Sequence, residues 1–242
     1  MGLKINQETK AFATIEEVGA AIILIKKGLI EILNMKSHKS SVYKHIPLLL
    51  LSNGFERLLK CILIFQYFKV NYVFPTEIGN FFKEYRNGHG LDLMLNEVIR
   101  IAKSSETMMS IPLSRREIEY LENEAMIEEL FKIFSDYAIS GRYYHIDIIT
   151  KQDFPKENPI LAFEKFREDI YTQLNYSINE FWENSDKLNE QNIYIIARIT
   201  KALCLCFTHA DFGYVASMHS DEVFEFTLLD EKDLKIMKYL KI

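Results

Sequence analysis

The sequence of 242 residues is poor in the residues that interrupt helices, with only 9 glycines and 5 prolines. Because glycine and proline mark turns and the ends of strands, their scarcity argues against many short strands and favours long helices. The composition is otherwise typical of globular proteins, with 48% hydrophobic and 26% charged residues. A chain of this length can bury a large core, in one domain or in two.

Cysteine is scarce as well, and the three cysteines, Cys61, Cys204 and Cys206, all lie in apolar runs. We expect them to be reduced core residues, which is typical of a cytosolic protein. The sequence contains no Cys-x-x-Cys, no Glu-x-x-His, no Gly-x-Ser-x-Gly and no Gly-rich phosphate loop. It therefore predicts no metal site and no cofactor.

No apolar run reaches the roughly 20 residues of a membrane span, because charged pairs interrupt the longest ones at Lys26-Lys27 and Glu56-Arg57. The first residues also lack the apolar core of a secretion signal. We therefore expect a cytoplasmic protein that does not associate with membranes. The net charge of −5 argues against general attraction to nucleic acids, so a polyanion would need a local basic patch.

Apolar residues recur every three or four positions along most of the chain, which indicates amphipathic helices. The pattern predicts helices over about 8–35, 42–69, 76–86, 91–104, 159–185 and 190–209. Ser114 and Glu117 have the spacing of a capping box and predict a helix that runs or kinks through Gly141 to about residue 150. Alternation over 223–227 predicts a short strand, and Asp230 is placed to cap a last helix.

These elements predict an all-α fold, a multi-helix bundle with two long antiparallel helices and additional C-terminal helices. Residues 1–153 would form the N-terminal bundle, and residues 154–242 a C-terminal helical part packed on it in one continuous domain. The boundary follows the linker that contains Pro155 and Pro159.

Glu56 is the most unusual residue of the predicted helix 42–69, because the sequence around it is almost entirely apolar. At about 100° per residue, Asn53, Glu56, Arg57 and Lys60 share one stripe of the helix. The stripe is either a solvated face with a Glu56–Lys60 pair, or the polar lining of a groove between helices.

Arg142 occupies an apolar stripe of the next candidate region, in 3-4-3 spacing with Ile139, Ile146 and Ile149, and His145 lies to its side. A core arginine needs a carboxylate, since it does not lose its proton on burial. We expect Glu56 to be that partner, either as a structural bridge or as part of a binding site.

Gly88-His89-Gly90-Leu91-Asp92 combines two glycines and a histidine at the start of a predicted helix. Free backbone N–H groups at such a start favour anions. The alternative is a turn in which His89 only packs locally.

Three of these stretches, Gly54 to Lys60, Gly88-His89 and Gly141 to Tyr144, together resemble the HEPN-like helical-bundle proteins of bacteria. The resemblance implies a bundle with two long antiparallel helices, frequent homodimers and links to RNA cleavage or nucleotide transfer. HEPN ribonucleases carry an arginine followed by four to six residues and a histidine. Here Arg86–His89 and Arg142–His145 enclose only two residues, which argues against ribonuclease activity.

Two hypotheses follow from the sequence. In the first, an interhelical polar groove binds a nucleotide or RNA, and His89 serves as acid or base if chemistry occurs. The binding residues of that groove would be Glu56, Arg57, Lys60, Asp92, Arg142, Tyr143 and His145. In the second, the chain is a non-enzymatic interaction module, either a homodimer or the partner of a toxin or nucleotidyltransferase.

Overall fold

The computed structural model describes residues 6–35, 41–150, 157–173, 185–212, 216, 221–235 and 240. Within these ranges every regular element is a helix, so the all-α prediction is confirmed. Among the described helices, none offers a stretch long and apolar enough to span a bilayer.

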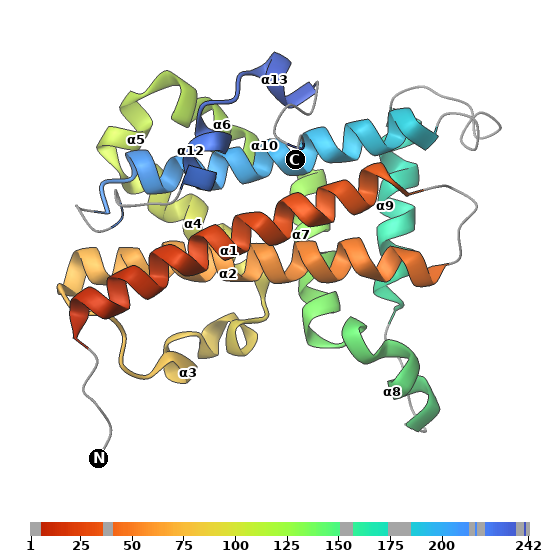
Figure 1. The fold of residues 1–242 in the computed structure, drawn as a ribbon, viewed down its shortest axis with the longest axis horizontal. Helices are drawn as coiled ribbons and strands as arrows, with labels where there is room; N and C mark the ends of the chain where they lie inside the picture. Colours follow the sequence, from red (N-terminus) through yellow and green to blue (C-terminus); the bar gives the residue numbers. More distant parts are fainter. Residues whose placement is uncertain are drawn as a thin grey trace.

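The two longest helices of the N-terminal half, α1 (Gln7–Leu33) and α2 (His45–Asn71), lie side by side and run antiparallel (Figure 1). A short 3₁₀ turn, η1 (Ser41–Lys44), leads into α2. The helices approach closely at Gly54, where an added Cβ would lie only 2.6 Å from the Ile25 side chain. The predicted helices 8–35 and 42–69 and their antiparallel pairing are therefore confirmed.

Helix α2 is the central element, packed against α1, α4 (Leu91–Ser104), α7 (Ala125–Ile139) and α10 (Ser185–His209). At its middle, the fully buried Phe55 stacks on Phe134 and meets Phe131 edge-on, with ring centroids 5.6 and 5.2 Å apart. The apolar character of α2 around its circumference thus reflects burial against several helices at once.

The connections of the N-terminal half contain short helices. Between α2 and α4 lie α3 (Ile78–Phe81) and η2 (Lys83–Gly88), and before α7 lie α5 (Glu106–Ser110) and α6 (Pro112–Asn123). After α7 the chain forms η3 (Gly141–Tyr143) and α8 (Tyr144–Thr150). The helix predicted from Ser114 to about residue 150 is therefore several helices.

The predicted capping box at Ser114 and Glu117 is wrong. Helix α6 begins at Pro112, because a proline at the first helical position lacks an N–H that the helix could not use there. Glu117 instead turns inward, is 2% exposed, and accepts a hydrogen bond from Arg198 Nε at 2.7 Å.

The C-terminal helices are α9 (Pro159–Gln173), α10, α12 (Asp221–Thr227) and α13 (Glu231–Lys235). Helix α9 packs on α7, and α10 packs on α1 and α6, so these helices lie on the N-terminal ones (Figure 1). The division at 153/154 falls outside the described residues and stays a prediction.

The strand predicted over 223–227 is wrong, because these residues form α12. Val223 and Phe226, three positions apart, are fully buried, while Phe224 is 44% exposed. The capping role of Asp230 is confirmed, since its Oδ1 accepts a hydrogen bond from the Asp233 backbone N–H at 2.7 Å.

Candidate functional site

Glu56 of α2 lies at the centre of a polar cluster formed by three separate parts of the chain. Its side chain is 12% exposed, and its Oε1 accepts from Lys60 Nζ at 2.7 Å. Its Oε2 lies 3.0 Å from His89 Nδ1 and 3.7 Å from Arg142 Nη2. Glu56, Lys60, His89 and Arg142 thus lie together in the structure, and we call this group, with Asn53, the Glu56 cluster.

The electrostatics of Glu56 are dominated by two opposing effects. Burial would raise the pKa of its carboxyl, but the hydrogen bonds from Lys60 and His89 outweigh it. The pKa of Glu56 is therefore held below its ordinary value, and the group is a carboxylate at neutral pH. It is an acceptor only, so it orients the N–H donors around it.

Arg142 reaches the cluster from η3, beyond the end of α7. Its Nη2 donates to Asn53 Oδ1 at 2.9 Å, and its buried Nε has no hydrogen-bond partner among the described residues. The prediction that it lies on an inward apolar stripe is wrong, because Ile146 and Ile149 are 57% and 81% exposed. Because α7 ends at Ile139 and the chain turns at Gly141, Ile139 does not share a helix face with Ile146 and Ile149 of α8.

His89 is positioned by a turn with unusual backbone geometry. Arg86, Asn87 and Gly88 all adopt left-handed conformations, with φ of 52°, 58° and 85°. Gly88 also packs against Lys60, whose Cε would lie 2.8 Å from an added Cβ. Left-handed non-glycine residues cost free energy and occur preferentially at functional sites.

Asp92 stabilises this turn and does not face Glu56. Its carboxylate accepts two hydrogen bonds from the Arg86 guanidinium, at 3.2 and 3.0 Å. The buried Ser135 of α7 donates to it at 2.7 Å and accepts from the Asp92 backbone N–H at 3.1 Å. Asp92 therefore fixes the loop that carries His89.

Three other predicted binding residues lie outside the Glu56 cluster. Arg57 forms an ion pair with Glu17 of α1 at 2.9 Å, on an exposed part of the surface. Tyr143 is 65% exposed. The His145 ring packs edge-on against His45, with centroids 5.6 Å apart. The sequence analysis placed these residues near Glu56 by assuming regular helices. The turn at η3 makes that assumption invalid for Tyr143 and His145.

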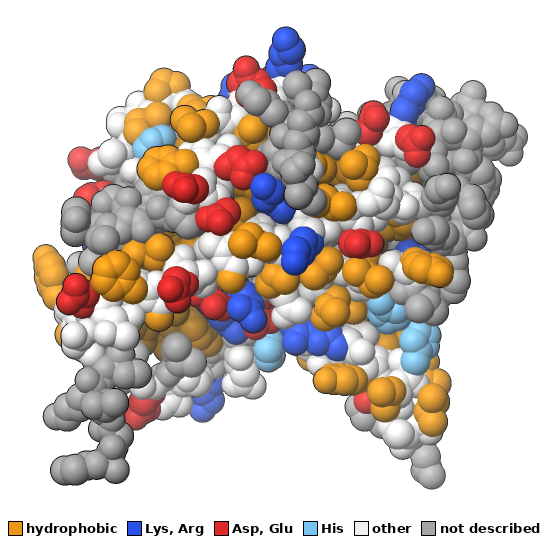
Figure 2. All heavy atoms as spheres, viewed as in Figure 1, with side chains coloured by type: hydrophobic (Ala, Val, Ile, Leu, Met, Phe, Trp, Pro, Cys, Tyr) orange, Lys and Arg blue, Asp and Glu red, His pale blue; other side chains and the backbone are white. Residues whose placement is uncertain are grey.

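The surface near the cluster is concave. Figure 2 shows a hollow between the projecting segment of α3 and η2 and the projecting α8, with Lys, Arg and His side chains along its edge. The cations of the cluster are partly accessible, since the side chains of Lys60, Arg142 and His89 are 25%, 30% and 42% exposed. A solvent-borne ligand can therefore reach them.

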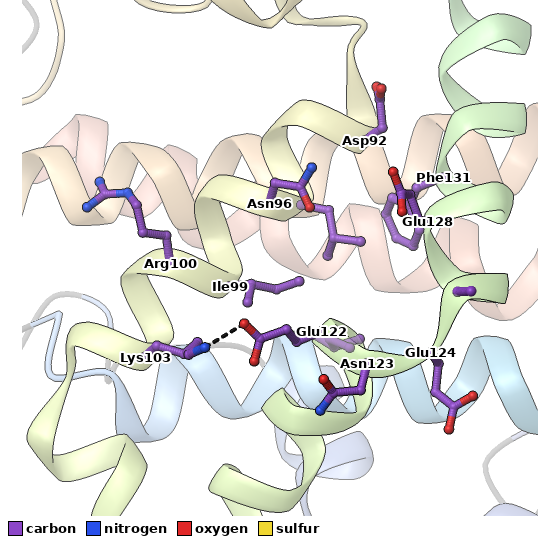
Figure 3. A pocket seen from close by; sticks show the side chains of 13 residues that line it. Asp92, Asn96, Ile99, Arg100, Lys103, Glu122, Asn123, Glu124, Glu128 and Phe131 are labelled. Carbon is purple, nitrogen blue, oxygen red and sulfur yellow. Dashed lines mark hydrogen bonds and ion pairs between the residues drawn. The ribbon is translucent and has the colours of Figure 1, made fainter.

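A pocket of about 510 Å³ lies between α4, α6 and the start of α7 (Figure 3). Four carboxylates line it: Asp92, Glu122, Glu124 and Glu128. Its two cations are already paired, Arg100 with Glu97 and Lys103 with Glu122. The pocket is therefore negatively charged and repels phosphate groups.

Comparisons of the chain with protein-family models, with curated proteins and with solved structures gave no match. Within the described ranges, no three His, Cys, Asp or Glu side chains lie together as metal ligands would. The Glu56 cluster, which gathers three basic side chains around one carboxylate, is therefore the candidate site.

Proposed function

We propose that the chain is an HEPN-like protein whose Glu56 cluster binds a phosphate group of a nucleotide or of RNA. The observation that carries the proposal is the arrangement of two permanent cations, Lys60 and Arg142, with His89 around one carboxylate. With His89 neutral, the cluster keeps one net positive charge, and with His89 protonated it keeps two. Phosphate recognition by such charge-assisted hydrogen bonds is common in proteins.

The proposed roles follow from what each group already contacts. Arg142 and Lys60 hold the phosphate, because their heads are partly exposed and each makes one side-chain hydrogen bond within the described part of the chain. Glu56 orients both cations. His89 would act as acid or base in any chemistry at the bound phosphate, since its ring is 42% exposed.

Binding of a ribonucleotide and of a short single-stranded RNA should be measured for wild type and for Arg142→Ala. We expect the variant to bind at least tenfold more weakly, as one charge-assisted hydrogen bond is worth about 1.5–3 kcal/mol. Wild-type affinity should also fall as salt rises. The matched control is Arg57→Ala, which removes an arginine of α2 that pairs with Glu17 outside the cluster.

Equal affinity of wild type and Arg142→Ala would refute the proposal, provided that circular dichroism shows both to be folded. A parallel RNA-cleavage assay with His89→Gln tests the chemical role. The spacing of arginine and histidine still argues against ribonuclease activity, so we expect binding without rapid cleavage.

A second candidate function, as an interaction module, is favoured by α8. No residue of this helix is buried, its Ile146, Ile148 and Ile149 are 57%, 47% and 81% exposed, and Tyr143 at the end of η3 is 65% exposed. Apolar side chains gather on the projecting end where α8 lies (Figure 2). Exposed apolar patches of this kind mark contacts with other proteins. The candidate partners are a second copy of the chain or a toxin or nucleotidyltransferase partner.

The two candidates make different predictions. If α8 forms a homodimer, sedimentation of wild type should depend on concentration, and the double variant Ile146→Ser/Ile149→Ser should stay monomeric. Leu228→Ser, which removes another exposed apolar side chain, is the control. If the Glu56 cluster is only a structural bridge, Arg142→Ala lowers the free energy of unfolding and leaves ligand affinity unchanged.

A further inference from the structure

A second basic pocket, formed by helices other than those of the Glu56 cluster, lies between α6, α10 and α13. It measures about 110 Å³. Helix α6 contributes Arg116, helix α10 contributes Arg198 and Lys201 one turn apart, and helix α13 contributes Glu231 at the rim. The volume is several times the roughly 30 Å³ that one water molecule occupies in the liquid.

Both guanidinium groups of this pocket are held by one buried carboxylate. Glu117, 2% exposed, accepts from Arg116 Nε and Nη2 at 3.0 and 2.7 Å, and from Arg198 Nε at 2.7 Å. The Arg198 guanidinium also stacks on the Tyr120 ring, 3.6 Å from its centroid. Both arginines are therefore fixed in orientation, and N–H groups that Glu117 does not use remain available.

Lys201 is the third cation and has no such partner. It is 2% exposed, and its ammonium donates to the Leu229 carbonyl. Among the described residues, no carboxylate lies within ion-pair distance of it. Burial lowers the pKa of Lys201, and the opposing effect of the Glu117 and Asp230 charges does not cancel this shift.

The acidic groups at the rim are already engaged. Glu231 pairs with Lys235 at 2.8 Å, and Asp230 accepts from the Asp233 backbone N–H. The pocket lining thus holds three cations and two carboxylates, Glu117 and Glu231, and keeps a net positive charge. A buried charge is stable only when it is compensated, so this imbalance itself points to a ligand.

We infer that this pocket binds a small oxyanion, either inorganic phosphate or the phosphate of a monoester. Arg116 and Arg198 would each donate N–H groups to the oxyanion. The buried Lys201 would add a third positive charge to the pocket lining. Glu231 lies at the pocket mouth in the field of Arg116 and Arg198, which both act to lower its pKa after the larger effect of Lys235. A bound oxyanion would be repelled by this carboxylate.

The test is a titration of the full chain with inorganic phosphate and, separately, with glycerol 3-phosphate. The ¹⁵N–¹H resonances of the arginine Nε groups report binding at this pocket, whatever happens at the Glu56 cluster. We expect saturable shifts of the Arg116 and Arg198 signals at millimolar phosphate or below, with chloride giving none. Tighter binding of the ester would identify a monoester as ligand, and equal or weaker binding would identify the free anion.

Three variants test the assignment. Arg116→Ala, which changes a side chain that is 58% exposed, should weaken phosphate binding about tenfold or more, followed at the Arg198 signal. Glu231→Gln should tighten it several-fold by removing the rim charge. Arg115→Ala, the exposed neighbour outside the pocket, should change nothing. Absence of saturable shifts in wild type would overturn the inference, and so would Glu231→Gln binding no tighter than wild type.

Discussion

Replacement of Glu56 by glutamine should destabilise the protein in a way that depends on pH. Glutamine keeps the shape of the side chain and removes its charge. The loss affects the contacts to Lys60 and His89 at 2.7 and 3.0 Å and the more distant Arg142. Each cation would then face a neutral amide in a partly buried place.

The exposure of Glu56 and of its partners bounds the loss of unfolding free energy in Glu56→Gln. Breaking a fully buried ion pair costs about 3–5 kcal/mol, and an exposed pair is worth about 0–1 kcal/mol. Glu56 is 12% exposed, but its partners are 25–42% exposed and so are partly screened by solvent. We therefore expect Glu56→Gln to lower the free energy of unfolding by about 2 kcal/mol at pH 7.

The sign of the pH dependence follows from the lowered pKa of Glu56 in the folded protein. A carboxyl whose folded pKa lies below its unfolded value, about 4.3, stabilises the fold above that pH. This stabilisation is lost as pH falls through the folded pKa, because the wild-type side chain is then also protonated. The difference between wild type and Glu56→Gln should therefore be full at pH 7 and shrink below pH ~4.

Urea denaturation followed by circular dichroism, repeated at several pH values, measures this difference. Glu17→Gln is the matched control, since Glu17 pairs with Arg57 at 2.9 Å but is 45% exposed, and we expect less than about 1 kcal/mol. A difference for Glu56→Gln that stays constant from neutral to acid pH would refute the charge-based reasoning. So would a difference no larger than that of the control.

Other predictions concern packing and protonation elsewhere. Gly54→Ala should destabilise by about 1–3 kcal/mol in urea denaturation, because its Cβ would overlap α1, whereas Gly79→Ala, with open space around it, should not destabilise. Ser135→Ala should cost about 1–3 kcal/mol, measured in the same way, because the backbone N–H and carboxylate of Asp92 lose a partner. Burial and a neighbouring histidine lower the pKa of His45 in the folded state, so stability should fall as pH drops through about 6.5, and His45→Gln should flatten this slope in denaturation series across that range.

The long helices were predictable because they bury a continuous stripe over many turns. In α1 and α4 the 3.6-residue period extends over enough residues to exclude other patterns, and in α2 the apolar run is too long for a strand. In α12 it does not, since Val223 and Phe226 are buried three apart within a short segment that also alternates. A run of five residues fits both periods, so only the packing of α12 on α10 and α1 decides between helix and strand.

The Glu56 cluster was predictable for a related reason. A carboxylate in an apolar helix needs compensation, and the sequence offers few unpaired basic residues at comparable places. The pairing with Arg142 was inferred from its placement on an apolar helical stripe, and that placement was wrong although the two side chains do meet. The role of Asn53 as its hydrogen-bond acceptor depends on the turn at η3, and no local pattern encodes that turn.

The basic pocket at α6 and α10 shows what that argument missed. Lys201 is flanked on its helix by the fully buried Ala197 and Cys204, so it is a charge in an apolar stripe, as Glu56 is. Because a charge in an apolar helix needs compensation, Lys201 also predicts a carboxylate partner. The structure places Glu117 nearby but commits it to two arginines, which leaves the ammonium with a carbonyl.

In the Glu56 cluster one carboxylate directly contacts each of its cations, whereas here one cation lacks an acidic contact. The pocket whose buried ammonium contacts no carboxylate among the described residues should therefore depend more strongly on an added anion for its stability. Phosphate is accordingly expected to raise the melting temperature of wild type and of Arg142→Ala, and to raise that of Arg116→Ala less.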